Sequence, residues 1–199
     1  MKQHRVVTPG ALAWLGMALL LGLAAVLAHG AVPTSIDWQP DRAAAEPWRA
    51  LTAVAVHYSR LHLAANLAGT LLVGALGWAV PVSWRATVAW AAAWPLTQLG
   101  LLAQPALTHY GGLSGVLHAG VAVVGVELLA YERGPRRVIG AALLAGLAVK
   151  VTLEAPWQGP LRHPPGWDIA VAPFAHLTGF VAGIGCALLL LPWRSLRRR

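Results

Sequence analysis

Six long apolar runs divide the 199-residue sequence, and they constrain the fold more than any other feature. Each run approaches the roughly 20 residues that an α-helix needs to cross the hydrocarbon core of a bilayer. The runs cover residues 11–29, 54–79, 84–103, 113–131, 137–153 and 170–191. We therefore expect an all-α membrane protein, in which residues 1–199 form a single membrane domain with six transmembrane helices.

The composition supports this class and excludes others. Only 11% of the residues are charged and 57% are hydrophobic, whereas soluble domains contain about 25% charged residues. Such a chain cannot maintain a soluble surface, and it is too apolar for intrinsic disorder. The net charge of +8 does not indicate nucleic-acid binding, because the basic residues lie between apolar runs, where they act as topology signals.

The basic residues predict the orientation of the chain. With both termini in the cytoplasm, ten of the fifteen Lys and Arg residues fall on the cytoplasmic side, as the positive-inside rule requires. These ten are Lys2, Arg5, Arg85, Arg133, Arg136, Arg137, Arg194, Arg197, Arg198 and Arg199. Alternatively, cleavage of a signal peptide near Ala28-His29-Gly30-Ala31 would leave five spans.

Several polar residues lie inside the apolar runs at one common depth. Ionisable groups are costly in a bilayer, so their alignment indicates a functional site. The second, fourth and sixth runs all start on the outer side, and each carries its polar residues near that start. These residues are His57, His62 and Asn66 on the second run, Ser114 and His118 on the fourth, and His176 on the sixth.

A serine and a histidine are the minimum machinery for acyl transfer, because the base removes the hydroxyl proton and makes the serine nucleophilic. Gly112 and Gly115 flank Ser114, and His176 precedes a Gly179-x-x-x-Gly183 packing motif. Close packing of the two helices would place Ser114 within hydrogen-bonding distance of His176.

The tetrahedral intermediate of such a reaction also needs hydrogen-bond donors. His62 and Asn66 are four residues apart, so they share one helix face, and with the backbone amide of Ser114 they could supply these donors. Taken singly, each residue has a structural interpretation: Ser114 as a helix contact, His62 with Asn66 as an interhelical hydrogen-bonding pair, and His176 as a cap for a loop carbonyl. Only the combination points to catalysis.

The order and spacing of these motifs resemble the rhomboid intramembrane serine proteases. The shared pattern comprises Trp48-Arg49, His57-x4-His62-x3-Asn66, Gly112-Leu-Ser114-Gly115 and Ala175-His176-x2-Gly179-x3-Gly183. The resemblance implies a six-helix rhomboid-like bundle that needs no cofactor or metal. It further implies a Ser114–His176 dyad without a third acidic member, an oxyanion site of His62, Asn66 and the Ser114 amide, and a supporting role for His57. His118 stands where many rhomboids carry a tyrosine that packs on the catalytic histidine.

The small size and the stretch Gly-Leu-Ser-Gly-Val-Leu-His resemble the rhombosortase branch of that family. This resemblance implies a bacterial inner-membrane protease with its active site toward the outer side. The implied substrate is a transmembrane protein whose C-terminal tail has a Gly-Gly motif, an apolar helix and basic residues.

Two other functions fit parts of the sequence. A bis-histidine haem or metal protein could use His62, His118 and His176, since neutral imidazoles suit haem iron or zinc. That reading leaves Ser114 and Asn66 unexplained. A catalytically inactive rhomboid-like binding protein is the other alternative, although such relatives usually lack the serine or the histidine.

Overall fold

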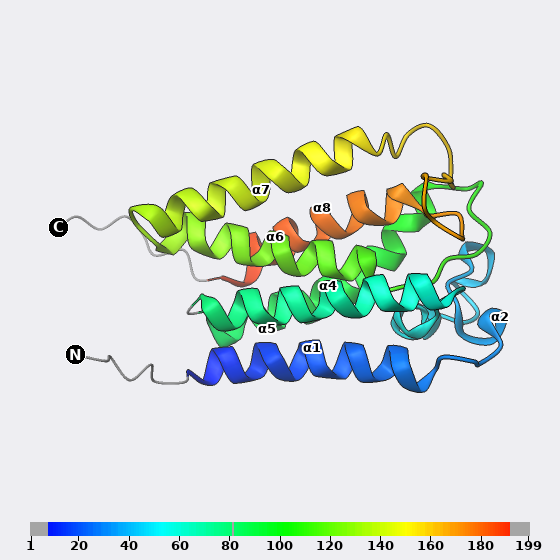
Figure 1. The fold of residues 1–199 in the computed structure, drawn as a ribbon, viewed down its shortest axis with the longest axis horizontal. Helices are drawn as coiled ribbons and strands as arrows, with labels where there is room; N and C mark the ends of the chain where they lie inside the picture. The colour runs from blue at the N-terminus through cyan, green and yellow to red at the C-terminus, as the bar shows by residue number, and fades with distance from the viewer. Residues whose placement is uncertain (1–7, 81, 192–199) are drawn as a thin grey trace.

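The computed structural model describes residues 8–80 and 82–191. The long helices lie roughly side by side, and short helices and loops gather at one end of the bundle (Figure 1). We call this end the loop end, and the opposite end, where α1 begins and α8 ends, the terminal end. Of the basic residues that predict the orientation, Lys2, Arg5, Arg194, Arg197, Arg198 and Arg199 lie outside the described residues.

One long helix overlaps each apolar run. The long helices are α1 (Pro9–Leu27), α4 (Arg60–Ala79), α5 (Trp84–Leu99), α6 (Ser114–Tyr131), α7 (Pro135–Leu153) and α8 (Pro173–Leu190). The loop end carries α2 (Pro33–Ile36), η1 (Pro40–Arg42), α3 (Arg49–Thr52) and η2 (Ala53–Ala55), and η3 (Gly100–Ala103) extends α5. The second long helix begins later than its apolar run does, because Ser59 caps α4 by accepting a hydrogen bond from the His62 amide.

Length and composition make four of the described helices suitable for crossing a membrane: α1, α4, α6 and α8. The helix α5 is shorter, with 16 residues, and α7 carries Arg136, Arg137 and Lys150. That all six long helices cross the membrane therefore stays a prediction.

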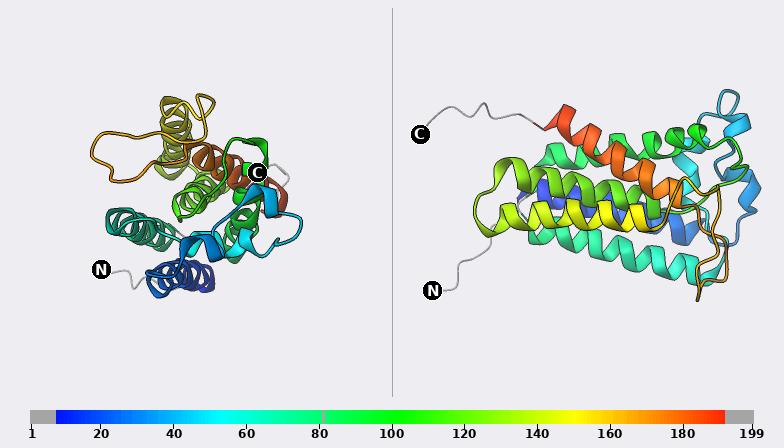
Figure 2. Two further views of the ribbon diagram at one scale, coloured as in Figure 1. Left: turned by 90° about the vertical axis from the view of Figure 1, so that its right-hand side faces the viewer. Right: turned by 90° about the horizontal axis from the view of Figure 1, so that it is seen from above.

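The helix α6 forms the centre of the bundle. It packs against α4, α5, α7 and α8, and the end-on view in Figure 2 shows these helices arranged around it. Its residues Val116, Ala119 and Val123 have no exposed surface. Because four helices pack around α6, these contacts set the position of its first residues beneath the loop end.

Glycines bring α8 into backbone contact with α6. A Cβ atom on Gly179 would overlap the carbonyl of Gly115, and a Cβ on Gly183 would lie 2.5 Å from the carbonyl oxygen of Ala119. Only glycine allows two helix backbones to approach this closely. The Gly-x-x-x-Gly spacing predicts this close contact between helices. The contact places the start of α8 beside the start of α6.

Candidate active site

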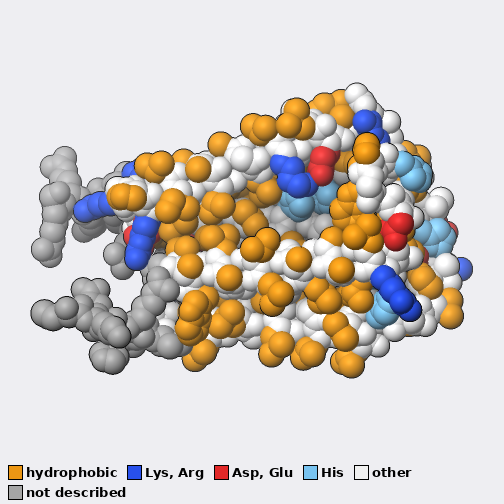
Figure 3. Space-filling view, viewed as in Figure 1, with side chains coloured by type: hydrophobic (Ala, Val, Ile, Leu, Met, Phe, Trp, Pro, Cys, Tyr) orange, Lys and Arg blue, Asp and Glu red, His pale blue; other side chains and the backbone are white. Residues whose placement is uncertain are grey.

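A cavity of about 880 Å³ lies between α4, α6 and α7 and under the loop that joins α7 to α8. Its deeper lining is apolar and includes Leu72, Val121 and Leu147, whereas its lining near the loop end is polar. Figure 3 shows a hollow between α7 and α4, with basic, acidic and histidine side chains together at its loop end. The polar part of this cavity brings together residues from four long helices, α4, α6, α7 and α8.

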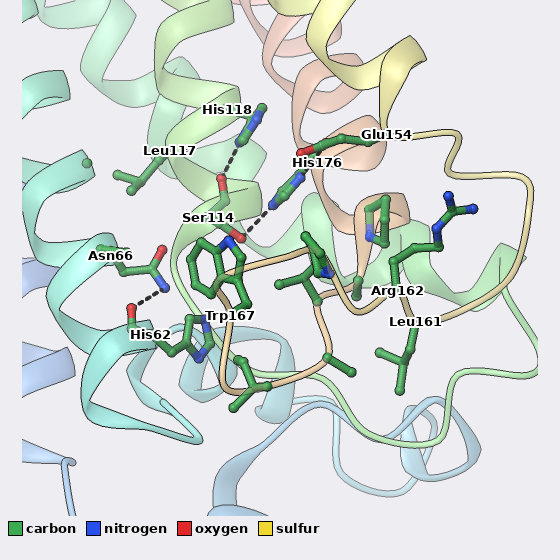
Figure 4. Close-up of a pocket in the computed structure, with 18 of the residues that line it drawn as sticks. His62, Asn66, Ser114, Leu117, His118, Glu154, Leu161, Arg162, Trp167 and His176 are labelled. Carbon is green, nitrogen blue, oxygen red and sulfur yellow. Dashed lines mark hydrogen bonds and ion pairs between the residues drawn. The ribbon is translucent and has the colours of Figure 1, made fainter.

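Ser114 and His176 meet in the polar part of the cavity (Figure 4). Ser114 is the first residue of α6, and His176 lies in the first turn of α8, where Pro173 starts the helix. The Nε2 atom of His176 lies 2.9 Å from the Oγ atom of Ser114. This is the hydrogen-bonding distance that a nucleophile and its general base require.

Glu154 lies on the other side of the His176 ring. Its Oε2 atom is 2.7 Å from Nδ1 of His176, and its Oε1 atom accepts a 2.6 Å hydrogen bond from Nζ of Lys150. Burial raises the pKa of Glu154, but the hydrogen bonds and charges of His176 and Lys150 outweigh it and lower the pKa to about 2. Glu154 is therefore an ionised, acceptor-only group at neutral pH.

The ionised carboxylate fixes the tautomer of His176. Since Glu154 can only accept a hydrogen bond, Nδ1 of His176 carries a hydrogen and donates a hydrogen bond to the carboxylate. The lone pair of a neutral imidazole then lies on Nε2, where the hydroxyl of Ser114 donates its hydrogen. The arrangement therefore presents a base to the serine.

His62 and Asn66 line the same cavity from α4. The Nδ1 atom of His62 accepts a 3.4 Å hydrogen bond from the backbone amide of Tyr58, so Nε2 carries the imidazole proton. The side-chain amide of Asn66 uses one hydrogen to reach the carbonyl of His62 at 3.1 Å, and its second hydrogen remains for a ligand. Both side chains therefore hold a donor that can serve a bound oxyanion.

At Gly112 the backbone lies close to the side chains of His62 and Asn66. Gly112 has φ +124, and a Cβ atom here would lie 2.7 Å from Nε2 of His62 and 3.6 Å from Nδ2 of Asn66. Any other residue would be strained at this positive φ, and its side chain would displace His62. The glycine before the serine thus keeps the α4 donors next to the start of α6.

The sequence model of one known family, described as Rhomboid domain, matches residues 44–193. The match covers three quarters of the 199 residues and includes every residue of the cavity named above. The chain belongs to the rhomboid family. It is thus an integral membrane protein of a family of intramembrane serine proteases, and it matches no protein of curated function.

Two further histidines lie beside Ser114 and His176 in this rhomboid. The ring of His118 stacks on that of His176, with centroids 4.3 Å apart, and its Nδ1 donates to the Ser114 carbonyl at 2.6 Å. The ring of His57 contacts that of His62, with centroids 4.8 Å apart. Burial lowers the pKa of His57 to about 4, so it is a neutral packing partner.

The Trp48-Arg49 pair of this rhomboid lies apart from the cavity lining. Arg49 is buried and donates to the backbone carbonyls of Thr34 and Asp37 at 3.1 and 2.9 Å. Its guanidinium also lies over the Trp48 ring. Since Asp37 in turn contacts His109 and Tyr58, which line the cavity, the pair holds the loop end in place.

Glu154 and Lys150 also line the cavity, although neither is among the site residues that the sequence predicts. The spacing of the two residues was the available signal: they are one helical turn apart at the end of the fifth apolar run. That end lies on the same side as the starts of the second, fourth and sixth runs. The missing information was that α7 packs against α6 and α8, which brings this turn to His176.

The donor set around His176 fits a metal ion poorly. His118, Glu154 and His176 offer ligand atoms within 4.8 Å of one another. However, the two imidazole planes are stacked and only 10° apart, and a metal ion must lie in the plane of each imidazole that binds it. In addition, the ammonium of Lys150 already pairs with Glu154. A haem or metal site is therefore not favoured by the geometry.

Proposed function

We propose that this rhomboid is an intramembrane serine endopeptidase in which Ser114 is the nucleophile and His176 the general base. The observation that carries this proposal is the 2.9 Å contact between Ser114 Oγ and His176 Nε2 inside a cavity. Both residues of the family motif are in place, and this favours an active enzyme over an inactive binding relative.

In the first step Ser114 Oγ attacks the carbonyl carbon of a substrate peptide bond. The hydroxyl proton passes to Nε2 of His176, and the carbonyl oxygen becomes an oxyanion. The helix α6 begins at Ser114, so its first amides have no carbonyl partner within the helix and form a partly positive end. The Ser114 amide, Nε2–H of His62 and the second amide hydrogen of Asn66 would stabilise the oxyanion.

Collapse of the intermediate breaks the C–N bond, and His176 gives its proton to the leaving amine. A water molecule then adds to the acyl-enzyme with His176 again acting as base, and the acyl group leaves Ser114 as a carboxylic acid. The polar part of the cavity lies at the loop end, where water from one membrane face has the shortest path. With the predicted topology, this is the outer face of the bacterial inner membrane.

The apolar part of the cavity also favours a transmembrane segment as the substrate. Its apolar lining comes from α4, α6 and α7, and the hollow in Figure 3 runs along the groove between α4 and α7. An apolar segment that lies in this groove would lead into the polar end at Ser114. The segment must unwind to expose a carbonyl, and glycine unwinds most readily. We therefore include a C-terminal Gly-Gly tail of the rhombosortase type as the proposed substrate.

A tail-processing experiment tests this function. A secreted reporter with a C-terminal Gly-Gly motif, apolar helix and basic tail is co-expressed with the protein, and mass spectrometry locates the new C-terminus. We expect cleavage at the Gly-Gly motif with the wild type, and intact reporter with Ser114→Ala. Cleavage within the apolar helix would keep the protease and reject the Gly-Gly specificity, whereas equal cleavage with Ser114→Ala would reject the protease.

A further inference from the structure

Glu154 lies where the third residue of a serine-protease triad lies. The carboxylate contacts Nδ1 of His176 at 2.7 Å, and Nε2 of the same ring contacts Ser114 at 2.9 Å. The imidazole is thus held from both sides, by groups from α7 and α6. Such a carboxylate fixes the tautomer of the histidine and stabilises the imidazolium that forms during attack.

The carboxylate is itself held in place. Lys150, one turn earlier on α7, donates to Oε1 at 2.6 Å, which leaves Oε2 directed at His176. The side chain of Glu154 is 28% exposed and that of His176 is 12% exposed. The carboxylate therefore lies at the edge of the cavity, and its charge faces a ring that is largely removed from water.

We propose that Glu154 is a positioning residue that completes a Ser114–His176–Glu154 triad in this rhomboid. The proposal rests on the proposed function, since it assigns Glu154 a role through the general base. It differs from the dyad that the family resemblance implies. In this triad Glu154 accepts the Nδ1–H bond throughout and takes up no proton, while the proton of Ser114 moves to Nε2 and then to the leaving group.

The charged and titratable groups around His176 come from three helices. Lys150 and Glu154 face it from α7, and His118 stacks on it from α6. His62 lies across the cavity on α4. Lys150 and Glu154 carry opposite charges, and both lie near Nδ1 of the ring: Oε2 of Glu154 at 2.7 Å and Nζ of Lys150 at 3.5 Å. Glu154 makes the shorter contact. Loss of the Glu154 charge is therefore expected to change the pH dependence of serine reactivity.

The test measures the rate at which a fluorophosphonate probe labels the detergent-solubilised full-length protein between pH 5 and 9. The variants are Glu154→Gln, which is isosteric and neutral, and Glu154→Asp, which retains the charge. The matched control is Glu132→Gln, because Glu132 also pairs with a basic residue four positions away, Arg136, but at the terminal end. Circular dichroism verifies that each variant is folded.

We expect Glu154→Gln to label at least about 30-fold more slowly than wild type, because the histidine loses its preferred tautomer. The rise of its rate with pH should also move to lower pH, since the imidazolium loses a neighbouring negative charge. Glu154→Asp should lose less rate and keep the wild-type pH profile, and Glu132→Gln should match wild type. If Glu154 had a purely structural role, its substitution would not shift the pH profile of the labelling rate.

Two results would overturn the triad. Glu154→Gln could label within threefold of wild type with an unchanged profile, or, if this variant does not fold, Glu154→Asp could show a shifted profile. Ser114→Ala and His176→Ala distinguish this failure from failure of the proposed function. If the wild type labels only when both residues are present, the protease stands and the triad alone is rejected; if it labels no more than Ser114→Ala, both are rejected.

Discussion

Among single residues, His118 connects Ser114 and His176. It donates to the backbone carbonyl of Ser114, and its ring covers one face of His176. The opposite ring edges of His176 are occupied by Ser114 and Glu154. Rotation of the His176 ring is thus restricted by packing on its face as well as by hydrogen bonds in its plane.

Substitution of His118 tests this packing role. An aromatic pair contributes about 1 kcal/mol beyond buried area, which corresponds to roughly fivefold in rate if it is lost at the base. We expect His118→Ala to reduce fluorophosphonate labelling about fivefold or more, and His118→Phe to stay within about threefold of wild type. Equal loss in both variants would instead assign the effect to the hydrogen bond with the Ser114 carbonyl.

Most residues of the candidate site could be predicted from the sequence, but one residue and its contact could not. Ser114, His176, His62 and Asn66 could be named because they interrupt apolar runs at one depth, and the structure lines one cavity with all four. Glu154 could not, because a carboxylate at a helix end is usually solvated. Its partner His176 lies 22 positions away and depends on how α7 packs.

At the scale of elements, the contact between α6 and α8 decides whether Ser114 and His176 meet. The two helices touch through Gly115 and Ala119 on α6 and through Gly179 and Gly183 on α8. A side chain at this contact must push the backbones apart. Ser114 and His176 lie within one turn of this contact. Separation of the two backbones would therefore lengthen the 2.9 Å distance between Ser114 Oγ and His176 Nε2.

Two alanine substitutions on α8 separate packing from helix propensity. Gly179→Ala places a methyl group against the Gly115 carbonyl, whereas a Cβ on Gly185 meets nothing within 4 Å. We expect Gly179→Ala to destabilise the protein by about 1–3 kcal/mol and to abolish most labelling. Gly185→Ala should unfold at or above the wild-type temperature. Thermal unfolding in detergent measures the stability of both variants. Equal unfolding temperatures would contradict the close backbone contact between α6 and α8.

The helix positions could be anticipated from the apolar runs, but the start of α4 could not. Residues 54–59 belong to the second apolar run, yet the helix starts only at Arg60. The chain before it forms α3 and η2, and Gly112 donates its amide to the Ala53 carbonyl. Composition does not distinguish such a buried loop from a membrane span, because both are apolar.

For the molecule as a whole, the proposed function requires the loop end to face outward. The polar cavity lies at that end, whereas Arg133, Arg136 and Arg137 lie at the terminal end, where α6 passes into α7. The positive-inside rule places these arginines in the cytoplasm. The predicted active site then opens on the outer face, away from cytoplasmic proteins.

Cysteine accessibility tests this orientation. The natural Cys186 is buried, so Cys186→Ala provides a background for single cysteines. Trp157→Cys places a thiol on the exposed loop after α7, and Arg133→Cys places one at the terminal end. A maleimide that cannot cross the inner membrane should label Trp157→Cys in cells with a permeabilised outer membrane and should label Arg133→Cys only after lysis. The reverse pattern would place the active site in the cytoplasm.

Mass mapping of the adduct that a fluorophosphonate forms with the purified protein tests directly whether Ser114 is the nucleophile. The reaction joins phosphorus to an activated serine and releases fluoride, so the modified residue reports the nucleophile itself. We expect one adduct, located on the peptide that contains Ser114, and its loss in His176→Ala. An adduct on a different serine, or an equal yield on Ser114 without His176, would contradict the account.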